Sequence, residues 1–136
     1  MDIIKTGFNG LFVIKPDVFT DKRGYFFESF NIATYNGAGM VFTPVQDNES
    51  RSSKGVIRGL HYQLNPYAQA KLIRVVEGKI IDVALDIRKD SPSFGKWYGI
   101  ELDSENKTQL FIPRGFAHGF SVLSDVAVIL YKVDNI

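Results

Sequence analysis

Residues 71–86 read KLIRVVEGKIIDVALD, and this stretch indicates the fold class of the whole chain. Two runs rich in β-branched residues, Lys71–Glu77 and Lys79–Asp86, flank a single glycine, Gly78. Valine and isoleucine favour strands, and glycine supplies the positive φ that a short hairpin loop requires. The stretch therefore predicts two buried strands joined by a tight turn.

Other segments of the chain have the same character, with β-branched or aromatic residues between polar punctuation. They are Leu11–Ile14, Tyr25–Phe30, Gly55–Gln63, Trp97–Leu102, Gln109–Ile112, Phe116–Val122 and Ala127–Lys132. The one helical candidate is the short segment Ile32–Asn36, and the runs Ser91–Gly95 and Asp103–Asn106 are expected to be loops. Short strands separated by turns predict an all-β sandwich or barrel, in a single domain that spans residues 1–136.

The composition of the chain excludes several broad classes of protein. Its 136 residues are 45% hydrophobic and 23% charged, which is the balance of a folded globular protein. The formal net charge of +1 argues against a nucleic-acid partner, and the chain has no cysteine for disulfides or thiolate metal sites. No apolar run reaches the roughly 18–20 residues that cross a bilayer, so no membrane partner is expected. The first residues lack a signal-peptide pattern, and a cytoplasmic location is the default expectation.

The chain has only two histidines, and both lie in short motifs rich in glycine, arginine and aromatic residues. His61 lies in the motif RGLHYQ at residues 58–63. On a strand with alternating faces, Arg58 points to one side, while His61 and Gln63 point to the other side, toward a cavity. Because the pKa of free imidazole is close to neutral, His61 is a candidate for proton transfer. The alternative is a hydrogen-bonded histidine in the core.

His118 lies in the second motif, PRGFAHGF at residues 113–120. This spacing of proline, glycine and histidine resembles the second sequence box of cupin barrels, whose metal-bearing members use the histidine as a ligand. The other ligands of such a site are missing, because Gln63 stands where a further histidine would be. Transition-metal sites usually need three protein ligands, so we expect no metal. His118 is then either structural or in contact with substrate.

Lysine, tyrosine and arginine side chains complete a possible acid–base site. Lys71 opens an apolar strand, and its ammonium, like the guanidinium of Arg58, is suited to an anionic substrate or an enolate oxygen. Tyrosines such as Tyr131 in the last strand usually pack in the core, but a phenol can also return a proton opposite a base. Two carboxylates in an apolar strand, Asp82 and Asp86, are expected to pair with arginines.

Two polar segments have weaker signals. Arg23 and Glu28 lie among aromatic residues in DKRGYFFESF, residues 21–30, where the ordinary expectation is a turn with solvated charges. Residues 46–50, QDNES, form a polar run that is expected to be a loop. The sequence leaves open whether this loop also lines a site.

Taken together and in order along the chain, these motifs resemble the dTDP-4-dehydrorhamnose 3,5-epimerase family, the metal-free cupins of deoxysugar biosynthesis. The matching motifs are DxRGxFxExF at residues 21–30, QDNxS at 46–50, RGLHxQ at 58–63, QxKL at 69–72, GxxxDV at 78–83, DxRxxSPxFG at 86–95, IPxGFAHGF at 112–120 and YK at 131–132. Each motif alone is a modest signal, whereas the whole series in the same order is highly specific.

The resemblance implies a cupin-type jelly-roll β-barrel or sandwich that needs no cofactor and forms a homodimer with shared strands. It implies epimerisation at C3 and C5 of dTDP-4-dehydro-6-deoxy-D-glucose, which gives dTDP-4-dehydro-L-rhamnose. His61 corresponds to the family's base, Tyr131 to its acid and Lys71 to the residue beside the C4 oxygen. The remaining matches would hold the diphosphate, sugar or nucleotide, namely Arg58, Arg23 of the partner subunit, Glu28, Gln46, Asn48 and His118.

The chain ends at Ile136, whereas the resemblance implies a further C-terminal segment with an acidic residue that pairs with the catalytic histidine. The sequence thus predicts an epimerase domain that is C-terminally short relative to the family. Asp82 or Asp86 would replace that acidic residue only with suitable geometry, and we expect a longer version of the chain to be faster. Three alternatives stay open: a C3-only epimerase or ketoisomerase, a non-catalytic sugar-nucleotide-binding module, and a metal-dependent cupin oxygenase.

Overall fold

The computed structural model describes all residues of the chain, 1–136. In chain order its elements are β1 (Asp2–Lys5), β2 (Phe12–Lys15), β3 (Val18–Asp21), β4 (Gly24–Phe27), α1 (Ile32–Gly37), β5 (Gln46–Ser53), β6 (Ile57–His61), β7 (Lys71–Glu77), β8 (Lys79–Asp86), β9 (Trp97–Asp103), β10 (Gln109–Ile112), β11 (Phe116–Val122) and β12 (Val126–Val133). Every strand pairing is antiparallel. The predicted all-β class is confirmed.

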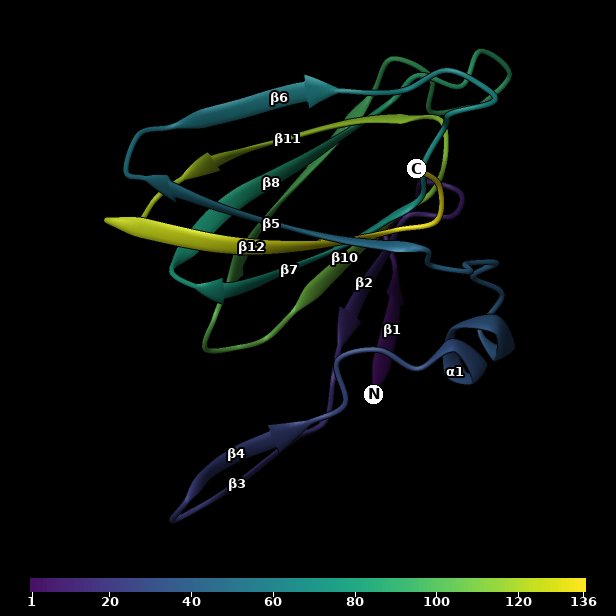
Figure 1. Ribbon diagram of the computed structural model, residues 1–136. Helices are drawn as coiled ribbons and strands as arrows, with labels where there is room; N and C mark the ends of the chain where they lie inside the picture. The colour runs from purple at the N-terminus through teal and green to yellow at the C-terminus, as the bar shows by residue number, and fades with distance from the viewer.

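Most of the strands form two sheets that face each other (Figure 1). The larger sheet has the strand order β1-β2-β10-β7-β12-β5, and the smaller sheet has the order β6-β11-β8-β9. From β7 onward the chain crosses repeatedly between the two sheets, which is the winding of a cupin-type jelly roll. The edge strands β5 and β6 follow each other in the chain and are joined by the short connection 54–56.

The hydrophobic core lies between the two sheets, in a space that we call the lumen. Along β8 the buried positions are 80, 82, 84 and 86, so the strand alternation turns these positions inward. Core residues from both sheets meet there, including Ile73 and Ile129 of the larger sheet and Ile80 and Phe120 of the smaller. A residue that shares a strand face with one of these core residues therefore points into the lumen.

The other face of the larger sheet is covered by α1 and the segment that follows the helix. Asn31 caps the helix, because its side-chain oxygen accepts hydrogen bonds from two backbone N–H groups of the first turn. Tyr35 and Phe42 pack against Phe111 in a second buried cluster. The predicted helix is confirmed and extends one residue further, to Gly37.

Two connections differ from the sequence predictions. Gly78 does join β7 to β8, with a φ of +86°, but the two strands lie in different sheets. The predicted hairpin is therefore a crossover between sheets. The expected loop at residues 46–50 is the start of β5, which pairs with β12 from Gln46 opposite Val133 to Ser53 opposite Val126. Pairing rather than propensity makes this polar segment a strand, and edge strands are commonly polar because their outer side faces water.

Strands β3 and β4 form a separate hairpin outside the two sheets (Figure 1), and the ring of Tyr25 lies 3.9 Å from the ammonium of Lys107 in the β9–β10 connection. The expected strand Tyr25–Phe30 is β4, and it ends at Phe27 because it pairs only with β3. Every residue from Val18 to Phe26 is exposed. Three aromatic side chains of the hairpin, Phe19, Tyr25 and Phe26, are 66%, 62% and 72% exposed.

Candidate active site

The first histidine motif forms an edge strand with a β-bulge. Arg58 of β6 lies opposite Phe120 of β11, and His61 lies opposite His118, so three steps on β6 match two steps on β11. A bulge re-aims the side chains that follow it. Arg58 and His61 consequently share the face of two buried residues and both point toward the lumen. The prediction that they lie on opposite faces is wrong, because it assumed unbroken alternation.

Two glycines make this close pairing possible. A side chain on Gly59, whose φ is +118°, would place a Cβ atom 2.6 Å from the Cα of Gly119. A Cβ on Gly119 would lie 2.8 Å from the backbone oxygen of Arg58. Neither separation leaves room for a carbon atom, so only glycine lets β6 and β11 approach this closely. The approach brings the backbone of His61 alongside that of His118.

Lys71 and Tyr131 reach the lumen from the larger sheet. Lys71 lies two residues before Ile73 on β7, and Tyr131 lies two residues after Ile129 on β12, so each shares the inward face of a core residue. Tyr131 is half-buried, and its phenol shares a 2.6 Å hydrogen bond with the hydroxyl of Ser50. Lys71 is also half-buried, and its ammonium makes no hydrogen bond or ion pair within the chain.

The surroundings of the lumen change the acidity of both groups. Desolvation lowers the pKa of Lys71, and the negative charge of Asp82 opposes this effect. Desolvation raises the pKa of Tyr131, while the Ser50 hydrogen bond and the charge of Arg58 lower it and Asp82 raises it. Asp82 therefore acts electrostatically on two groups that belong to the opposite sheet.

His118 and Asp82 form a buried pair on the smaller sheet. His118 is 4% exposed and Asp82 is 0% exposed. Nε2 of His118 and Oδ1 of Asp82 are 2.5 Å apart, and Oδ2 of Asp82 is buried without any hydrogen-bond partner. The prediction that Asp82 pairs with an arginine is wrong, because its one hydrogen-bond partner is His118. Arg58 donates from Nε to the hydroxyl of Ser52 at 2.8 Å. The ring of His118 lies 6.4 Å from that of Tyr131, centroid to centroid, so the pair adjoins the phenol.

The polar edge strand β5 adds a row of side chains to the mouth of the lumen. Alternate residues of β5 lie opposite the inward-facing residues of β12, and they are Gln46, Asn48, Ser50 and Ser52. Gln46 and Asn48, the predicted substrate contacts, are exposed, whereas Ser50 and Ser52 bind Tyr131 and Arg58. Sequence reasoning missed the two serines. No alternation of polar and apolar residues marks them, because every residue from 46 to 53 is polar.

Two of the predicted site residues lie apart from the others. Arg23 is at the tip of the β3–β4 hairpin, where its Nη2 lies 2.6 Å from a carboxylate oxygen of Asp21. Glu28 is exposed and directly follows β4. In Figure 1 the hairpin and β6 lie at opposite sides of the molecule. Within one chain, Arg23 and Glu28 do not reach the site around His61.

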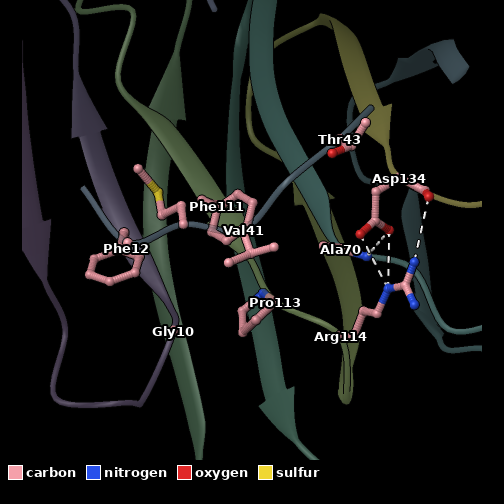
Figure 2. Close-up of a pocket in the computed structure, with 11 residues that line it drawn as sticks. Gly10, Phe12, Val41, Thr43, Ala70, Phe111, Pro113, Arg114 and Asp134 are labelled. Atoms are coloured by element: carbon pink, nitrogen blue, oxygen red, sulfur yellow. Dashed lines mark hydrogen bonds and ion pairs between the residues drawn. The ribbon is translucent and has the colours of Figure 1, made fainter. Parts of the chain in front are cut away.

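Two cavities limit what a single chain can hold. His61 and Lys71 line a small cavity of about 40 Å³, together with Tyr62, Gln63, Gln69, Gly115 and Phe116. Ligand pockets usually measure roughly 300–1,000 Å³, so this cavity alone does not enclose a sugar nucleotide. A larger cavity of about 600 Å³ lies on the α1 side of the larger sheet, between Phe12, Val41, Phe111 and the ion pair of Arg114 with Asp134 (Figure 2). It is lined by none of the predicted site residues.

The second buried carboxylate of β8 is fully bonded. Asp86 accepts two hydrogen bonds of 3.0 Å from the guanidinium of Arg88 and one of 2.5 Å from each of Ser91 and Ser93. Burial would raise the pKa of Asp86, but these hydrogen bonds hold it well below its usual range. The predicted arginine pairing is confirmed here. Neither carboxylate of β8 bonds to His61, so neither replaces the acidic partner that the resemblance implies.

The chemistry available in the lumen is that of acids, bases and hydrogen-bond donors. Two imidazoles, an ammonium, a phenol and a buried carboxylate meet there, and such a set can move protons and stabilise an oxyanion. No group of three or more histidine, cysteine, aspartate or glutamate side chains comes together to hold a metal ion. None of the helices has the length and apolar character needed to cross a membrane.

The fold and the site together define a cupin-type jelly roll with an acid–base cluster in its lumen. Comparison with family models identifies one family within this class of proteins. The model described as dTDP-4-dehydrorhamnose 3,5-epimerase matches residues 5–136. The chain belongs to this family.

Individual relatives agree along nearly the whole chain. A dTDP-4-dehydrorhamnose 3,5-epimerase from Shigella flexneri is 57% identical over 136 residues, which are 99% of this chain and 75% of that protein. The dTDP-6-deoxy-D-glucose-3,5-epimerase of Legionella pneumophila, solved in complex with dTDP-4-keto-L-rhamnose, has a TM-score of 0.95 at 49% identity over 99% of this chain and 72% of that one. A 3'-monoepimerase from Streptomyces bikiniensis, solved with dTDP-quinovose, has a TM-score of 0.91 at 31% identity over 98% of this chain and 68% of that one. The chain is thus shorter than each of these relatives.

Proposed function

We propose that this chain is an isomerase that epimerises C3 and C5 of dTDP-4-dehydro-6-deoxy-D-glucose to give dTDP-4-dehydro-L-rhamnose, without a cofactor. One observation carries the proposal: His61 from the smaller sheet and Lys71 from the larger sheet line the same cavity, and Tyr131 enters the same lumen. Family membership and the dTDP-sugar held by the Legionella relative support the substrate class.

The proposed reaction divides each epimerisation into two proton transfers. The imidazole of His61 removes the proton next to the C4 ketone, and the electron pair of the broken C–H bond moves into an enolate. The ammonium of Lys71 stabilises the negative charge that develops on the C4 oxygen. The phenol of Tyr131 then donates a proton to the same carbon from the opposite face, which inverts it. Placing these groups around a bound sugar lowers the barrier because their orientation is fixed in advance.

The other predicted contacts hold the substrate in this proposal. Arg58 binds the diphosphate, since a planar guanidinium can bind two phosphate oxygens at once. Gln46, Asn48 and His118 contact the sugar or the nucleotide. The imidazole of His118 is suited to this role because only one of its nitrogens is engaged, by Asp82.

A homodimer completes the site in this proposal. A two-stranded hairpin is marginally stable in water by itself, and the hairpin β3–β4 exposes three large aromatic side chains. Docking of this hairpin on a second copy of the chain would cover those rings. It would also bring Arg23 of the partner subunit, and with it Glu28 of the partner subunit, to the open mouth of the lumen, where the small cavity needs further walls.

Nuclear magnetic resonance of the product formed in deuterated water tests the function. We expect deuterium at both C3 and C5 of the sugar. Deuterium at C3 alone would instead support a C3-only epimerase, the activity that the name of the Streptomyces bikiniensis relative describes. A ketone at a new position would indicate a ketoisomerase, and tight dTDP binding without any deuterium in the sugar would indicate a binding module.

A further inference from the structure

Asp82 is the least satisfied polar residue of the chain. Its carboxylate is fully buried and has a single hydrogen bond, to His118. Its Oδ2 is the only buried side-chain nitrogen or oxygen in the structure that has no hydrogen-bond partner. Burial of a carboxylate costs free energy unless the charge is paired and hydrogen-bonded. An incompletely bonded carboxylate in a native core therefore requires a reason beyond packing.

The lumen provides that reason, because ionisable groups surround Asp82. On its own sheet these groups are His118 of β11 and, beyond it, Arg58 and His61 of β6; from the opposite sheet they are Lys71 of β7 and Tyr131 of β12. Arg58 is already bound by Ser52, and His118 by Asp82 itself. Lys71 is the cation in this group that has no partner within the chain.

The pair of Asp82 and His118 carries a net negative charge in its simplest form. An ionised carboxylate only accepts hydrogen bonds, so Nε2 of His118 must carry the proton between the two groups. With a neutral imidazole, the charge of the carboxylate is not cancelled. This charge opposes loss of the proton from Lys71 and also from Tyr131. An ammonium and a phenol are the two forms that enolate chemistry at this site needs.

We propose that Asp82 is a positioning residue: its buried carboxylate, fixed by His118, keeps the Lys71 side chain as an ammonium and the Tyr131 side chain as a phenol. The consequence for catalysis rests on the proposed function, whereas the effect on Lys71 does not. His118 has a part in this arrangement apart from any substrate contact, because it holds one oxygen of the carboxylate while the other oxygen stays buried without a hydrogen-bond partner.

The decisive experiment follows the protonation of Lys71 directly in the protein without substrate. Protein with lysine labelled by ¹³C at Cε is titrated by nuclear magnetic resonance, and the Lys71 signal is assigned from its absence in Lys71→Arg. In Asp82→Asn, which keeps the shape of the side chain but removes its charge, we expect the pKa of Lys71 to fall by about one pH unit or more. An unchanged Lys71 titration would overturn the proposal.

Two further variants make the titration conclusive. Asp86→Asn is the matched control, because Asp86 lies on the same strand and is equally buried, but its charge is paired with Arg88. We expect the pKa of Lys71 in Asp86→Asn to equal that in the wild type. A similar fall of this pKa in Asp86→Asn and Asp82→Asn would contradict a specific role for Asp82. If Asp82→Asn does not fold, Asp82→Leu combined with His118→Phe removes the charge together with its polar partner, because buried pairs are often replaceable by apolar residues. The same fall of the Lys71 pKa is then expected.

The pH dependence of turnover gives a second readout and separates this inference from the proposed function. In Asp82→Asn we expect kcat to fall off at a lower pH on the basic side of the profile, with KM changed little, because Lys71 loses its proton earlier. If the wild type places no deuterium in the sugar, the proposed function fails while the titration still decides the role of Asp82. If the wild type is active and Asp82→Asn keeps the basic side of its profile, the inference fails while the function stands.

Discussion

Two carboxylates on β8, Asp82 and Asp86, lie four residues apart, point to the same side of the strand and are equally buried, yet their surroundings differ. Asp86 receives hydrogen bonds from a guanidinium and two hydroxyls, whereas Asp82 has one partner and an unbonded oxygen. Burial alone therefore does not distinguish a structural residue from a functional one. The number of hydrogen bonds does distinguish the two surroundings: the charge of Asp86 is fully bonded by its neighbours, whereas that of Asp82 is not.

The cluster around Asp86 has the properties of a structural clamp. Arg88 bonds to Asp86, donates to the backbone oxygen of Asn9 at 2.8 Å, and lies 4.7 Å from the ring centre of Phe116. It thereby ties the loop after β8 to the N-terminal segment and to β11. In the lumen cluster of His61, Lys71 and Tyr131, the only side-chain hydrogen bond within the chain is the one between Tyr131 and Ser50. We expect substitutions in the clamp to cost stability, and substitutions in the lumen to cost activity.

The largest effect on activity is expected for His61→Ala. A general base contributes about 10²–10⁴-fold in rate, so the rate at which deuterium enters C3 and C5 should fall by that factor. His61 is exposed and makes no hydrogen bond within the chain, so the free energy of unfolding should change by no more than about 0.5 kcal/mol. Calorimetry should show dTDP affinity close to that of the wild type. A comparable loss of dTDP binding would assign His61 a structural role and break the contrast between the two regions.

The largest effect on stability is expected for Asp86→Asn. Breaking a buried pair by removing one partner costs about 3–5 kcal/mol, and we expect the lower end because the Arg88 side chain is 28% exposed and retains some contact with water. Urea denaturation measures this loss. The rate of epimerisation per folded molecule should stay that of the wild type, since Asp86 is fully occupied by its own partners. A lower rate with unchanged stability would place Asp86 in the site.

The same variant has a pH dependence of defined sign. The pKa of Asp86 is depressed in the folded chain, so its ionised form contributes stability above the unfolded pKa of about 3.9 and loses that contribution as the pH falls toward the folded value. Asparagine has no such contribution to lose. The stability gap between wild type and Asp86→Asn should therefore be constant above about pH 5 and narrow below about pH 4. A gap that stays constant in acid would show that charge is not its source.

This contrast also shows what the sequence can and cannot predict. The strands from Lys71 to Asp86 are predictable because β-branched residues and local alternation specify them, and the pairing of Asp86 with Arg88 follows from neighbours two residues apart. The partner of Asp82 is not predictable in this way, because His118 comes from a different strand whose alignment is fixed only when the smaller sheet forms. Electrostatic partners across a sheet depend on register, which local sequence does not encode.

The arrangement of the candidate site has the same limit. His61, Lys71 and Tyr131 are found by family resemblance, but the relation of His61 to Arg58 depends on a bulge that needs Gly119 on another strand. Strand β5 escapes prediction because a polar run such as residues 46–50 has the composition of a loop and becomes a strand only by pairing with β12. In each case the sequence prediction lacks the tertiary contacts that determine the local structure.

A smaller effect on activity is expected for Tyr131→Phe, which removes only the hydroxyl. Loss of a general acid should slow product formation about 10²-fold, the low end for such groups, because water can reprotonate the enolate. Abstraction of the substrate proton should be slowed less than product formation, and both are read from label exchange in mixed light and heavy water. The stability should fall by about 1 kcal/mol for the lost hydrogen bond to Ser50. Equal slowing of abstraction and product formation would exclude Tyr131 as the acid.

The smallest effect is expected for Ser50→Ala, and it tests whether hydrogen bonds in the lumen adjust acidity more than stability. The Ser50 hydroxyl lowers the pKa of Tyr131, so its removal should raise that pKa, as measured by ultraviolet absorbance titration. A weaker acid should reprotonate the enolate a few-fold more slowly, while the unfolding free energy should fall by about 0.5–1.5 kcal/mol. Ser53→Ala is the matched control, because Ser53 lies on the same strand but is exposed and its hydroxyl makes no hydrogen bond. Equal rates in the two variants would show that the Ser50 hydrogen bond serves only to hold β5 against β12, as the bonds of Asp86 hold the clamp.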